Sequence, residues 1–465
     1  MGFRDLVLFY VVTGVSLRWI AAAASIGSSS LIIWVLAWLF FYVPLALSVI
    51  ELSSRYPAEG GLYVWTKKAF GEGAGFVAAW TYWTSNLPYF PAVLYFAASN
   101  ALFLRPSWQQ YSHSRQYFVI FSVLVLAALT VINVIGMNIA KWSFNVGALA
   151  MWIPALMVVV MGLVAWARFG SASSFRSVDL LPSMHLRDMI FWSTIIFAFG
   201  GAESASFLGG EIKNPRRTIP VALLTAGLTI SFCYIVGTFC VLLALPSNEI
   251  SNLDGLAQAI ERTATRLGGL HGVMPAAAAL IAISNIGAAA AFLAAAARLP
   301  FVAGLDGFLP GVFRRIHPRW HTPYASVLAQ GLIGMVFVFL GQAGTSVRGA
   351  YDVLVSIGVI TYMVPYLFLF VSFVRLQREP AGADVVRVPG GRVAATLLAI
   401  VGFCTAVFAI VLSLVPASDE PHKILMVTKV LGAAMVLIGL GVGLYLVGKA
   451  KRRMARGLNA GVVDE

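Results

Sequence analysis

Two ionisable side chains occur in apolar stretches where glycine also interrupts the pattern of a membrane-spanning helix. Arg18 follows Gly14 in the first of these stretches, and Glu203 follows Gly200 and Gly201 in the sixth. Both side chains lie near the middle of their stretch, where a charge costs roughly 2.5–3.5 kcal/mol on insertion scales. Each of them must therefore face a partner or a cavity, and their chemistry is that of binding charged groups.

The glycines predict that both helices are broken at mid-membrane. Two adjacent glycines weaken a helix by about 1 kcal/mol each, and backbone groups released by a break are tolerated in a membrane only where they line a cavity. Inverted repeats of five spans place two broken helices in this way, with the substrate between them. Free N–H groups then face a carboxylate, and free C=O groups face an ammonium. The alternative is that these glycines only allow close packing of helices.

The elements that carry these breaks follow from composition. Of the 465 residues, 60% are hydrophobic and 11% are charged, whereas soluble domains carry roughly 25% charged residues. A soluble protein of this size could not bury so much apolar surface. A helix needs about 20 apolar residues to cross a membrane. We predict an all-α membrane protein with twelve transmembrane helices, at 6–26, 29–53, 74–103, 117–139, 143–167, 188–211, 219–245, 273–303, 323–342, 351–375, 394–416 and 426–448.

The distribution of basic residues predicts the orientation of the chain. If both termini are cytoplasmic, 21 of the 32 lysines and arginines lie in cytoplasmic segments and ten lie outside, which follows the positive-inside rule. The formal net charge of +13 then reflects this orientation and contact with anionic membrane lipid, not nucleic-acid binding. We predict an integral membrane protein with both termini cytoplasmic, and the compact chain with short termini favours a bacterial inner membrane.

Three motifs resemble a known family. Span 6 reads Phe197-Ala-Phe-Gly-Gly-Ala-Glu-Ser-Ala205, and Glu211-Ile-Lys-Asn-Pro-Arg-Arg-Thr-Ile-Pro220 follows it. The connection between spans 2 and 3 reads Glu51-Leu-Ser-Ser-Arg-Tyr-Pro-Ala-Glu-Gly-Gly-Leu-Tyr63, and Arg298 precedes Gly304-Leu-Asp-Gly-Phe-Leu-Pro310. All three are similar to segments of the amino acid–polyamine–organocation (APC) superfamily of permeases, in the same order along the chain.

The resemblance implies a LeuT-type fold and a function. The chain would be a secondary active transporter of amino acids or closely related amines that works by alternating access. Residues 1–170 would form the first five-helix repeat, and residues 185–380 its inverted copy. Spans 11 and 12, residues 390–450, would be peripheral helices, and residues 451–465 a basic cytoplasmic tail.

The resemblance also implies a binding site. The α-carboxylate would lie on backbone N–H groups near Gly14–Ser16, and the α-ammonium on carbonyls near Phe199–Ala202. Ser284 and Asn285 of span 8 could line another wall, with a hydrogen bond between helices as the alternative. The predicted substrate-binding residues are Thr13, Gly14, Val15, Ser16, Arg18, Phe199, Gly200, Gly201, Ala202, Glu203, Ser284 and Asn285.

Arg18 departs from the family pattern, because many relatives have G-S-G-I-F where this chain has Thr13-Gly-Val-Ser-Leu-Arg-Trp19. Three interpretations are open. Arg18 could pair with Glu203, it could bind a second carboxylate through bidentate hydrogen bonds, or it could extend toward the membrane surface. The second favours an acidic amino acid. The third span, Tyr89-Phe-Pro-Ala-Val-Leu-Tyr95, resembles the glutamate–γ-aminobutyrate antiporters of the same superfamily.

Candidate gating and coupling residues lie near the cytoplasmic side. Glu211 could pair with Arg216 or Arg217 as a latch, or these residues could form a solvated helix end. Some proton-coupled members of the family that this chain resembles carry a lysine in span 5 in place of a sodium ion, but residues 143–167 contain no lysine. Span 8 offers only Ser284 for a sodium site. A coupling proton carried by Glu203 and exchange without an ion are the two modes that stay open.

Other classes of function lack their residues. The chain has no Gly-rich loop with a lysine for nucleotide phosphates, and its six histidines stand at no metal-ligand spacing. We therefore expect no enzyme, no bound metal and no cofactor. The alternatives within transport are an acidic amino acid or γ-aminobutyrate exchanger and a polyamine permease. Outside transport, the main alternative is a transporter-like sensor.

Overall fold

The computed structural model of the chain describes residues 1–182, 186–250, 255–268, 272–341, 347–380, 382, 384–415 and 423–461, and within these ranges all regular structure is helical. In the first half the helices are α1 (Phe3–Gly14), α2 (Leu17–Ala24), α3 (Ser30–Ala37), η1 (Trp38–Tyr42), α4 (Val43–Arg55), α5 (Leu62–Phe70), α6 (Glu72–Ala101), η2 (Leu102–Leu104), η3 (Pro106–Tyr111), α7 (Arg115–Ile135), α8 (Met137–Phe169) and α9 (Ser177–Leu180). In the second half they are α10 (Leu186–Ala198), η4 (Ser204–Glu211), α11 (Pro215–Ala244), η5 (Ser247–Glu249), α12 (Gly255–Arg266), α13 (Val273–Ala296), α14 (Arg298–Leu305), η6 (Gly311–Arg314), α15 (Tyr324–Gly341), α16 (Val347–Leu376), α17 (Gly391–Ser413) and α18 (Lys423–Gly461). The predicted all-α class is confirmed.

The described residues contain ten helical segments that are long and apolar enough to cross a membrane. Each coincides with one of the predicted spans. The two remaining predicted spans are α15, with 18 residues, and the sixth, which is split into α10 and η4. The chain is thus an integral membrane protein whose spans lie where the sequence predicts them.

Some helix boundaries differ from the prediction. Span 8 covers Val273–Gly304, close to its predicted bounds, but α13 ends at Ala296 and the short helix α14 follows, because Pro300 has no N–H to donate to the carbonyl four residues earlier. Span 12 continues past residue 448 to Gly461, so the predicted basic tail begins inside α18. Residues 462–465 of that tail, and the predicted repeat boundary at residue 185, lie outside the described residues.

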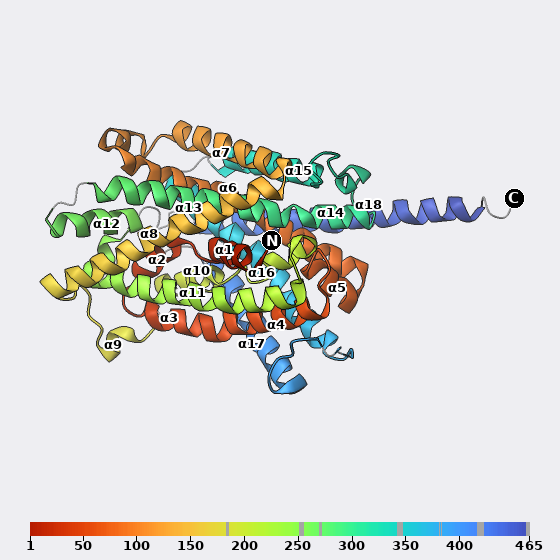
Figure 1. Cartoon of the computed structure of the whole chain (residues 1–465), viewed down its shortest axis with the longest axis horizontal. Coiled ribbons are helices and arrows are strands. Elements are labelled where there is room, and N and C mark those ends of the chain that lie inside the picture. The colour runs from red at the N-terminus through yellow and green to blue at the C-terminus, as the bar shows by residue number, and fades with distance from the viewer. Residues whose placement is uncertain are drawn as a thin grey trace.

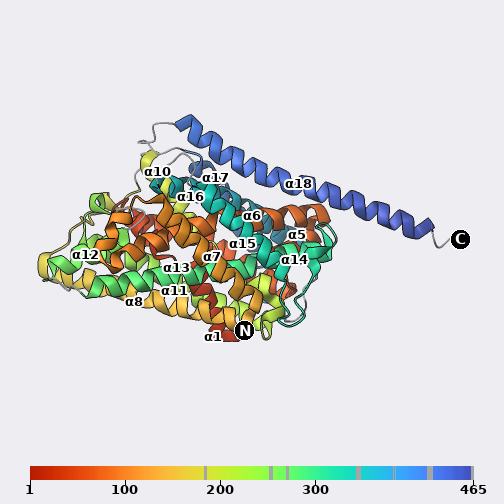
Figure 2. The ribbon, with the colours of Figure 1, turned by 90° about the horizontal axis from the view of Figure 1, so that it is seen from above.

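The two ends of the bundle carry different short helices (Figures 1 and 2). Helices α5 and α14 and the C-terminal part of α18 lie at one end, here called the inner end, whereas α12 lies at the opposite end. Ion pairs connect elements of the inner end: Lys67 Nζ is 2.6 Å from Asp306 Oδ2, and Arg452 Nη1 is 3.2 Å from Glu72 Oε2. Segments that the sequence predicts to be cytoplasmic therefore meet at one end.

Small residues bring the central helices into close contact. A Cβ on Gly147 of α8 would lie 2.7 Å from the Cα atom of Gly287 of α13, so these two backbones touch. In lipid, helices gain association energy mainly through such close packing, since no hydrophobic force drives them together. This contact positions the next turns of α13, with Ala288 and Phe292, beside the broken first span.

Candidate substrate site

Span 1 is broken where the sequence predicts the break. Helix α1 ends at Gly14, and α2 begins at Leu17. Val15 and Ser16 between them are extended, with φ/ψ of −106°/127° and −129°/120°. A β-branched valine and a serine that competes for backbone hydrogen bonds are both weak helix formers. Ser16 is the N-cap residue of α2, but its side chain accepts no hydrogen bond from the first N–H groups of that helix.

Span 6 is broken at its glycine pair. Helix α10 ends at Ala198, and the 3-10 helix η4 begins at Ser204. Gly201 has a φ of +105°, which a residue with a Cβ rarely adopts. Gly200 is needed for a different reason, since a Cβ there would lie 2.5 Å from Cε1 of Tyr362. The two glycines thus open the helix and admit a tyrosine of α16.

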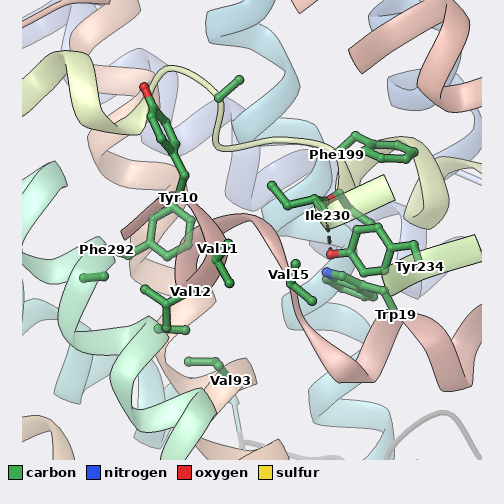
Figure 3. Packing of buried hydrophobic residues seen from close by; sticks show 14 of the residues in the cluster. Tyr10, Val11, Val12, Val15, Trp19, Val93, Phe199, Ile230, Tyr234 and Phe292 are labelled. Atoms are coloured by element: carbon green, nitrogen blue, oxygen red, sulfur yellow. Dashed lines mark hydrogen bonds between the residues drawn. The ribbon is translucent and has the colours of Figure 1, made fainter. Parts of the chain in front are cut away.

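Tyr234 of α11 joins the two breaks. Its hydroxyl donates to the carbonyl of Gly14 at 2.8 Å and lies 3.3 Å from the carbonyl oxygen of Ala198. The hydroxyl oxygen of Tyr234 also accepts a hydrogen bond from the N–H of Ser16 at 3.1 Å. Its ring packs edge to face against Phe199, at 5.7 Å between centroids (Figure 3). One hydroxyl therefore contacts three backbone groups that the breaks release.

A cavity of about 40 Å³ lies between the two breaks. Ligand pockets usually measure about 300–1,000 Å³, whereas a volume of tens of Å³ suffices for a water molecule. An amino acid therefore fits only after the surrounding helices separate. The wall residues come from spans 1, 3, 6, 8 and 10 and are Val12, Thr13, Gly14, Val15, Ser16, Arg18, Trp19, Ser85, Asn86, Tyr89, Phe197, Ala198, Gly200, Ala288, Phe292 and Tyr362.

Arg18 lies in the wall of this cavity and is 2% exposed. Its guanidinium carbon is 4.1 Å from the ring centroid of Trp19 and 5.4 Å from that of Tyr89. The Nε and Nη1 atoms are buried and have no hydrogen-bond partner. Two interpretations of the sequence therefore do not match the structure: Arg18 does not pair with Glu203, and it does not extend to the membrane surface.

Glu203 is fully buried and accepts three hydrogen bonds from tyrosine hydroxyls. Tyr82 of α6 donates to Oε1 at 2.7 Å. Two tyrosines of α16 complete the set, with Tyr362 donating to Oε1 at 3.0 Å and Tyr366 to Oε2 at 2.9 Å. Both carboxylate oxygens therefore have donors without any cation. We call Glu203 with Tyr82, Tyr362 and Tyr366 the tyrosine cage.

The end of span 6 is held by an arginine that the sequence did not single out as its partner. Glu211 Oε1 is 2.5 Å from Nη2 and 3.2 Å from Nε of Arg298, and Arg298 is buried. Arg216 and Arg217, the predicted partners, are exposed and form no ion pair with the described residues. Helix α11 starts at Pro215, and its first turn carries both arginines toward solvent.

Glu59, in the connection between α4 and α5, lies beside this ion pair. A Cβ on Gly210 would lie 3.2 Å from Glu59 Oε2. Burial raises the pKa of the Glu59 carboxyl above its ordinary value, while the charge of Arg298 opposes this rise and the carboxylate of Glu211 adds to it. One buried arginine at the inner end thus forms an ion pair with Glu211 and also lowers the pKa of Glu59 through its charge.

The geometry of two broken helices around a buried cavity agrees with a comparison against protein families. A family model described as amino acid permease matches residues 4–440. The chain belongs to the amino acid permease family. It is therefore a membrane transporter of amino acids or closely related amines, as its motifs predict.

This permease is similar over most of its length to several bacterial transporters. It is 27% identical over 424 residues to an uncharacterized transporter of Legionella pneumophila, with 90% of each chain covered. It is 25% identical over 421 residues to a glutamate/γ-aminobutyrate antiporter of Lactococcus lactis, covering 84% of this chain and 79% of that one. It is 24% identical over 359 residues to the probable agmatine/putrescine antiporter AguD of the same species, covering 77% and 75%. The two antiporters are named for compounds of different charge, because glutamate and γ-aminobutyrate carry a carboxylate whereas agmatine and putrescine do not.

The permease brings only part of the predicted site to the cavity. From the first break Thr13, Gly14, Val15, Ser16 and Arg18 line it, and from the second break Gly200 does so.

The other predicted residues of span 6 lie behind that wall. Phe199 packs against Trp34 and Tyr42, and the carbonyl of Gly201 accepts from Ser204 N–H at 3.0 Å. Ala202 and Glu203 are buried but do not line the cavity.

The polar pair of span 8 bonds to its own helix. Ser284 Oγ and Asn285 Nδ2 both donate to the carbonyl of Ile281, each at 2.8 Å. Ala288 and Phe292, one and two turns further along α13, line the cavity instead. Both bonds stay within α13, so they do not connect this helix to another one.

Sequence reasoning missed the walls that spans 3 and 10 contribute. Ser85, Asn86, Tyr89 and Tyr362 all line the cavity. A signal was present in span 3, where a Ser-Asn pair interrupts an apolar stretch and Tyr82 stands seven residues before Tyr89. This spacing puts both tyrosines on one helix face. Span 10 carried a comparable signal, because Tyr362 stands four residues before Tyr366 and both lie on one helix face.

Proposed function

We propose that the protein is a secondary transporter that works by alternating access and binds its amino acid or amine between the breaks of spans 1 and 6. The observation that carries this proposal is the buried cavity, whose wall includes residues of both broken helices. Broken helices present backbone N–H and C=O groups at mid-membrane, where they suit a carboxylate and an ammonium. The predicted substrate residues from Thr13 to Arg18 and from Phe199 to Glu203 belong to this proposal.

Opening toward the inner end would require three contacts of span 6 to separate. The first is the tyrosine cage, since Tyr362 both lines the cavity and donates to Glu203. The second is the contact of Ser206 with Gly61, where no Cβ would fit. The third is the ion pair of Glu211 with Arg298. These contacts follow one another from the cavity to the inner end, as the layers of a closed gate do.

The order of elements supports inverted repeats over residues 1–170 and 185–380. Spans 1 and 6 are both broken, and the short helices α5 and α12 follow spans 2 and 7. The short elements η2 and η3 follow span 3, just as α14 and η6 follow span 8. We further propose that the inner end, where Met1 contacts Glu211 and the C-terminal part of α18 lies, is cytoplasmic, and that the membrane is a bacterial inner membrane.

Exchange of one substrate for another and coupling to a proton are both compatible with this site. Two relatives are named as antiporters, which supports exchange. For proton coupling Glu203 is the candidate carrier, because its carboxyl group lies between the cavity wall and the inner end. Lipid contacts belong to the same proposal, since Lys449 and Lys451 at the inner end of α18 would face anionic headgroups.

The test is exchange in proteoliposomes that contain the purified full-length protein. Vesicles loaded with unlabelled amino acids, γ-aminobutyrate, agmatine or putrescine should take up the matching labelled compound. Gly201→Leu should abolish uptake, because leucine cannot adopt the φ of +105° that the break requires.

Gly439→Leu is the matched control. Gly439 lies in α18 with no atom within 4 Å of an added Cβ, so this variant should exchange normally. Uptake that survives Gly201→Leu in a correctly inserted protein would contradict the site. Binding without exchange in the wild type would support the sensor instead.

A further inference from the structure

We propose that Arg18 binds a carboxylate group of the transported molecule, so that the substrates are carboxylate-bearing amino acids and not carboxylate-free polyamines. This inference rests on the proposed function and names the substrate class of its site. It is carried by the unsatisfied N–H groups of Arg18, by the charges around the cavity and by the hydrogen bonds that already occupy the first break.

The unpartnered atoms belong to residues of the same cavity wall. Arg18 is 2% exposed, and its Nε and Nη1 have no hydrogen-bond partner. Ser16 Oγ, which belongs to another residue of the cavity wall, is also buried without a partner. Buried polar groups are nearly always hydrogen-bonded in folded proteins, and a guanidinium offers a rigid fork of donors that matches a carboxylate. Residues of the cavity wall thus carry hydrogen-bond donors for which the described residues provide no acceptor.

Among the described residues, no carboxylate forms an ion pair with this guanidinium. None of the described residues that line the cavity is an aspartate or glutamate. Glu203 is separated from the cavity by Tyr362 and is engaged by three hydroxyls. The rings of Trp19 and Tyr89 offer their faces, which attract a cation but accept no conventional hydrogen bond. The missing negative charge must therefore come from the bound molecule.

The backbone of the first break cannot provide all the donors that a carboxylate needs. The N–H of Ser16 donates to Tyr234 Oη at 3.1 Å, and the N–H of Val15 donates to the carbonyl of Val11 at 2.9 Å. Two amides near the expected carboxylate position are therefore occupied. Arg18, one turn further on, takes over part of that task. A diamine or agmatine would instead bring a second cation next to an uncompensated one.

The experiment measures ligand-induced thermal stabilisation of the detergent-purified full-length protein. The probes are alanine, glutamate, γ-aminobutyrate, agmatine and putrescine, compared in wild type, Arg18→Met and Arg18→Lys. Arg168→Met, which replaces an exposed arginine near the end of α8, is the matched control. Stabilisation requires binding to the folded state, so it reports affinity without requiring transport.

We expect stabilisation of wild type and of Arg168→Met by at least one carboxylate probe. Arg18→Met should weaken this binding at least about 100-fold, as truncation of a buried charged partner does. Arg18→Lys should weaken it roughly 10-fold, because the charge stays but the planar fork is lost. Stabilisation by alanine and glutamate alike would assign the α-carboxylate to Arg18, whereas stabilisation by glutamate alone would assign its side-chain carboxylate.

Three results would overturn the inference. They are stabilisation of the wild type by agmatine or putrescine, carboxylate binding that survives Arg18→Met, and absence of stabilisation by every carboxylate probe. The proposed function fails separately. If a probe stabilises the wild type but is never exchanged in proteoliposomes, the protein binds without transporting, and the substrate class inferred from Arg18 still holds.

Discussion

The two broken helices carry opposite charges and treat them differently. Glu203 has three hydroxyl donors from spans 3 and 10, whereas Arg18 lies against two ring faces and keeps two nitrogens without a partner. Burial does not distinguish them, since they are 0% and 2% exposed. The difference lies in their partners. A buried charge that the protein satisfies stabilises its packing, whereas one that it leaves unsatisfied marks a place for a ligand.

Glu203→Ala tests the satisfied side of this comparison and should have the largest effect. Three buried hydroxyls would lose their common acceptor, at about 1–3 kcal/mol for each group left unpaired. With partial rearrangement we expect a loss of roughly 3–5 kcal/mol in unfolding free energy and no exchange. Thermal unfolding followed by circular dichroism measures it. Glu203→Gln, which keeps an acceptor oxygen, should lose less than half as much. If Glu203→Ala were as stable as the wild type, the tyrosine cage would not contribute to the stability of the packing.

Arg18→Met tests the unsatisfied side and should change stability in the opposite direction. Removing a buried, uncompensated charge and replacing it with an apolar side chain of similar length should raise the unfolding free energy by roughly 1–3 kcal/mol. The same unfolding assay without any ligand measures this gain. A loss of stability instead would mean that the contacts of Arg18 with Trp19 and Tyr89 outweigh its unpaired charge, and the contrast between the two breaks would disappear.

Tyr234→Phe tests whether the two breaks are coupled. The hydroxyl contacts backbone groups of Gly14, Ser16 and Ala198, so its removal should cost about 1–2 kcal/mol. Tyr117→Phe, which removes a single bond to the carbonyl of Ala98, is the matched control and should cost less. If both variants lose the same stability, Tyr234 acts as an ordinary buried tyrosine and not as a link between the breaks.

The smallest expected effect concerns pH at the inner end. Burial raises the pKa of Glu59, with Arg298 opposing and Glu211 adding to the shift. The closed arrangement therefore binds this proton more tightly than an exposed carboxyl does. Its contribution to stability is largest at low pH and falls as pH rises from the ordinary value of about 4.3 through the raised value.

The measurement is the melting temperature of wild type and Glu59→Gln as the pH rises from the ordinary value of a glutamate carboxyl, about 4.3, toward neutral pH. The variant should show a flatter profile over this range. Glu379→Gln, at an exposed acid of the inner end, should leave the profile of the wild type in place. Parallel profiles of wild type and Glu59→Gln would show that Glu59 does not sense pH in the closed arrangement.

The spans and both breaks could be predicted from the sequence because they depend on local properties. Apolar length decides whether a helix can cross the membrane, and a glycine next to a β-branched residue, or a pair of adjacent glycines, decides where it breaks. Gly14 and Gly201 were found in this way. The break after Ala296 was not predicted, although its cause, Pro300, lies within the apolar run 273–303 that marks the span.

The contacts of the charged residues could not be predicted. Glu211 was expected to pair with Arg216 or Arg217, which are near in sequence, but it pairs with Arg298 at a separation of 87 residues. Arg18 was considered as a partner of Glu203, but the acceptor sites of Glu203 are taken by tyrosines. The sequence suggests partners that are near along the chain. The rotation of a helix about its axis decides which of these side chains face away from each other.

By itself the sequence determined the membrane class, the positions of the spans, the two mid-membrane breaks and the two charges beside them, because all of these follow from the properties of consecutive residues. Only the tertiary structure decided that one charge is satisfied and the other is not. Tyr82 lies 121 residues before Glu203, and Tyr362 lies 159 residues after it. No periodicity within a helix encodes such distances. They arise when small residues let helices approach and fix the face that each presents to the cavity.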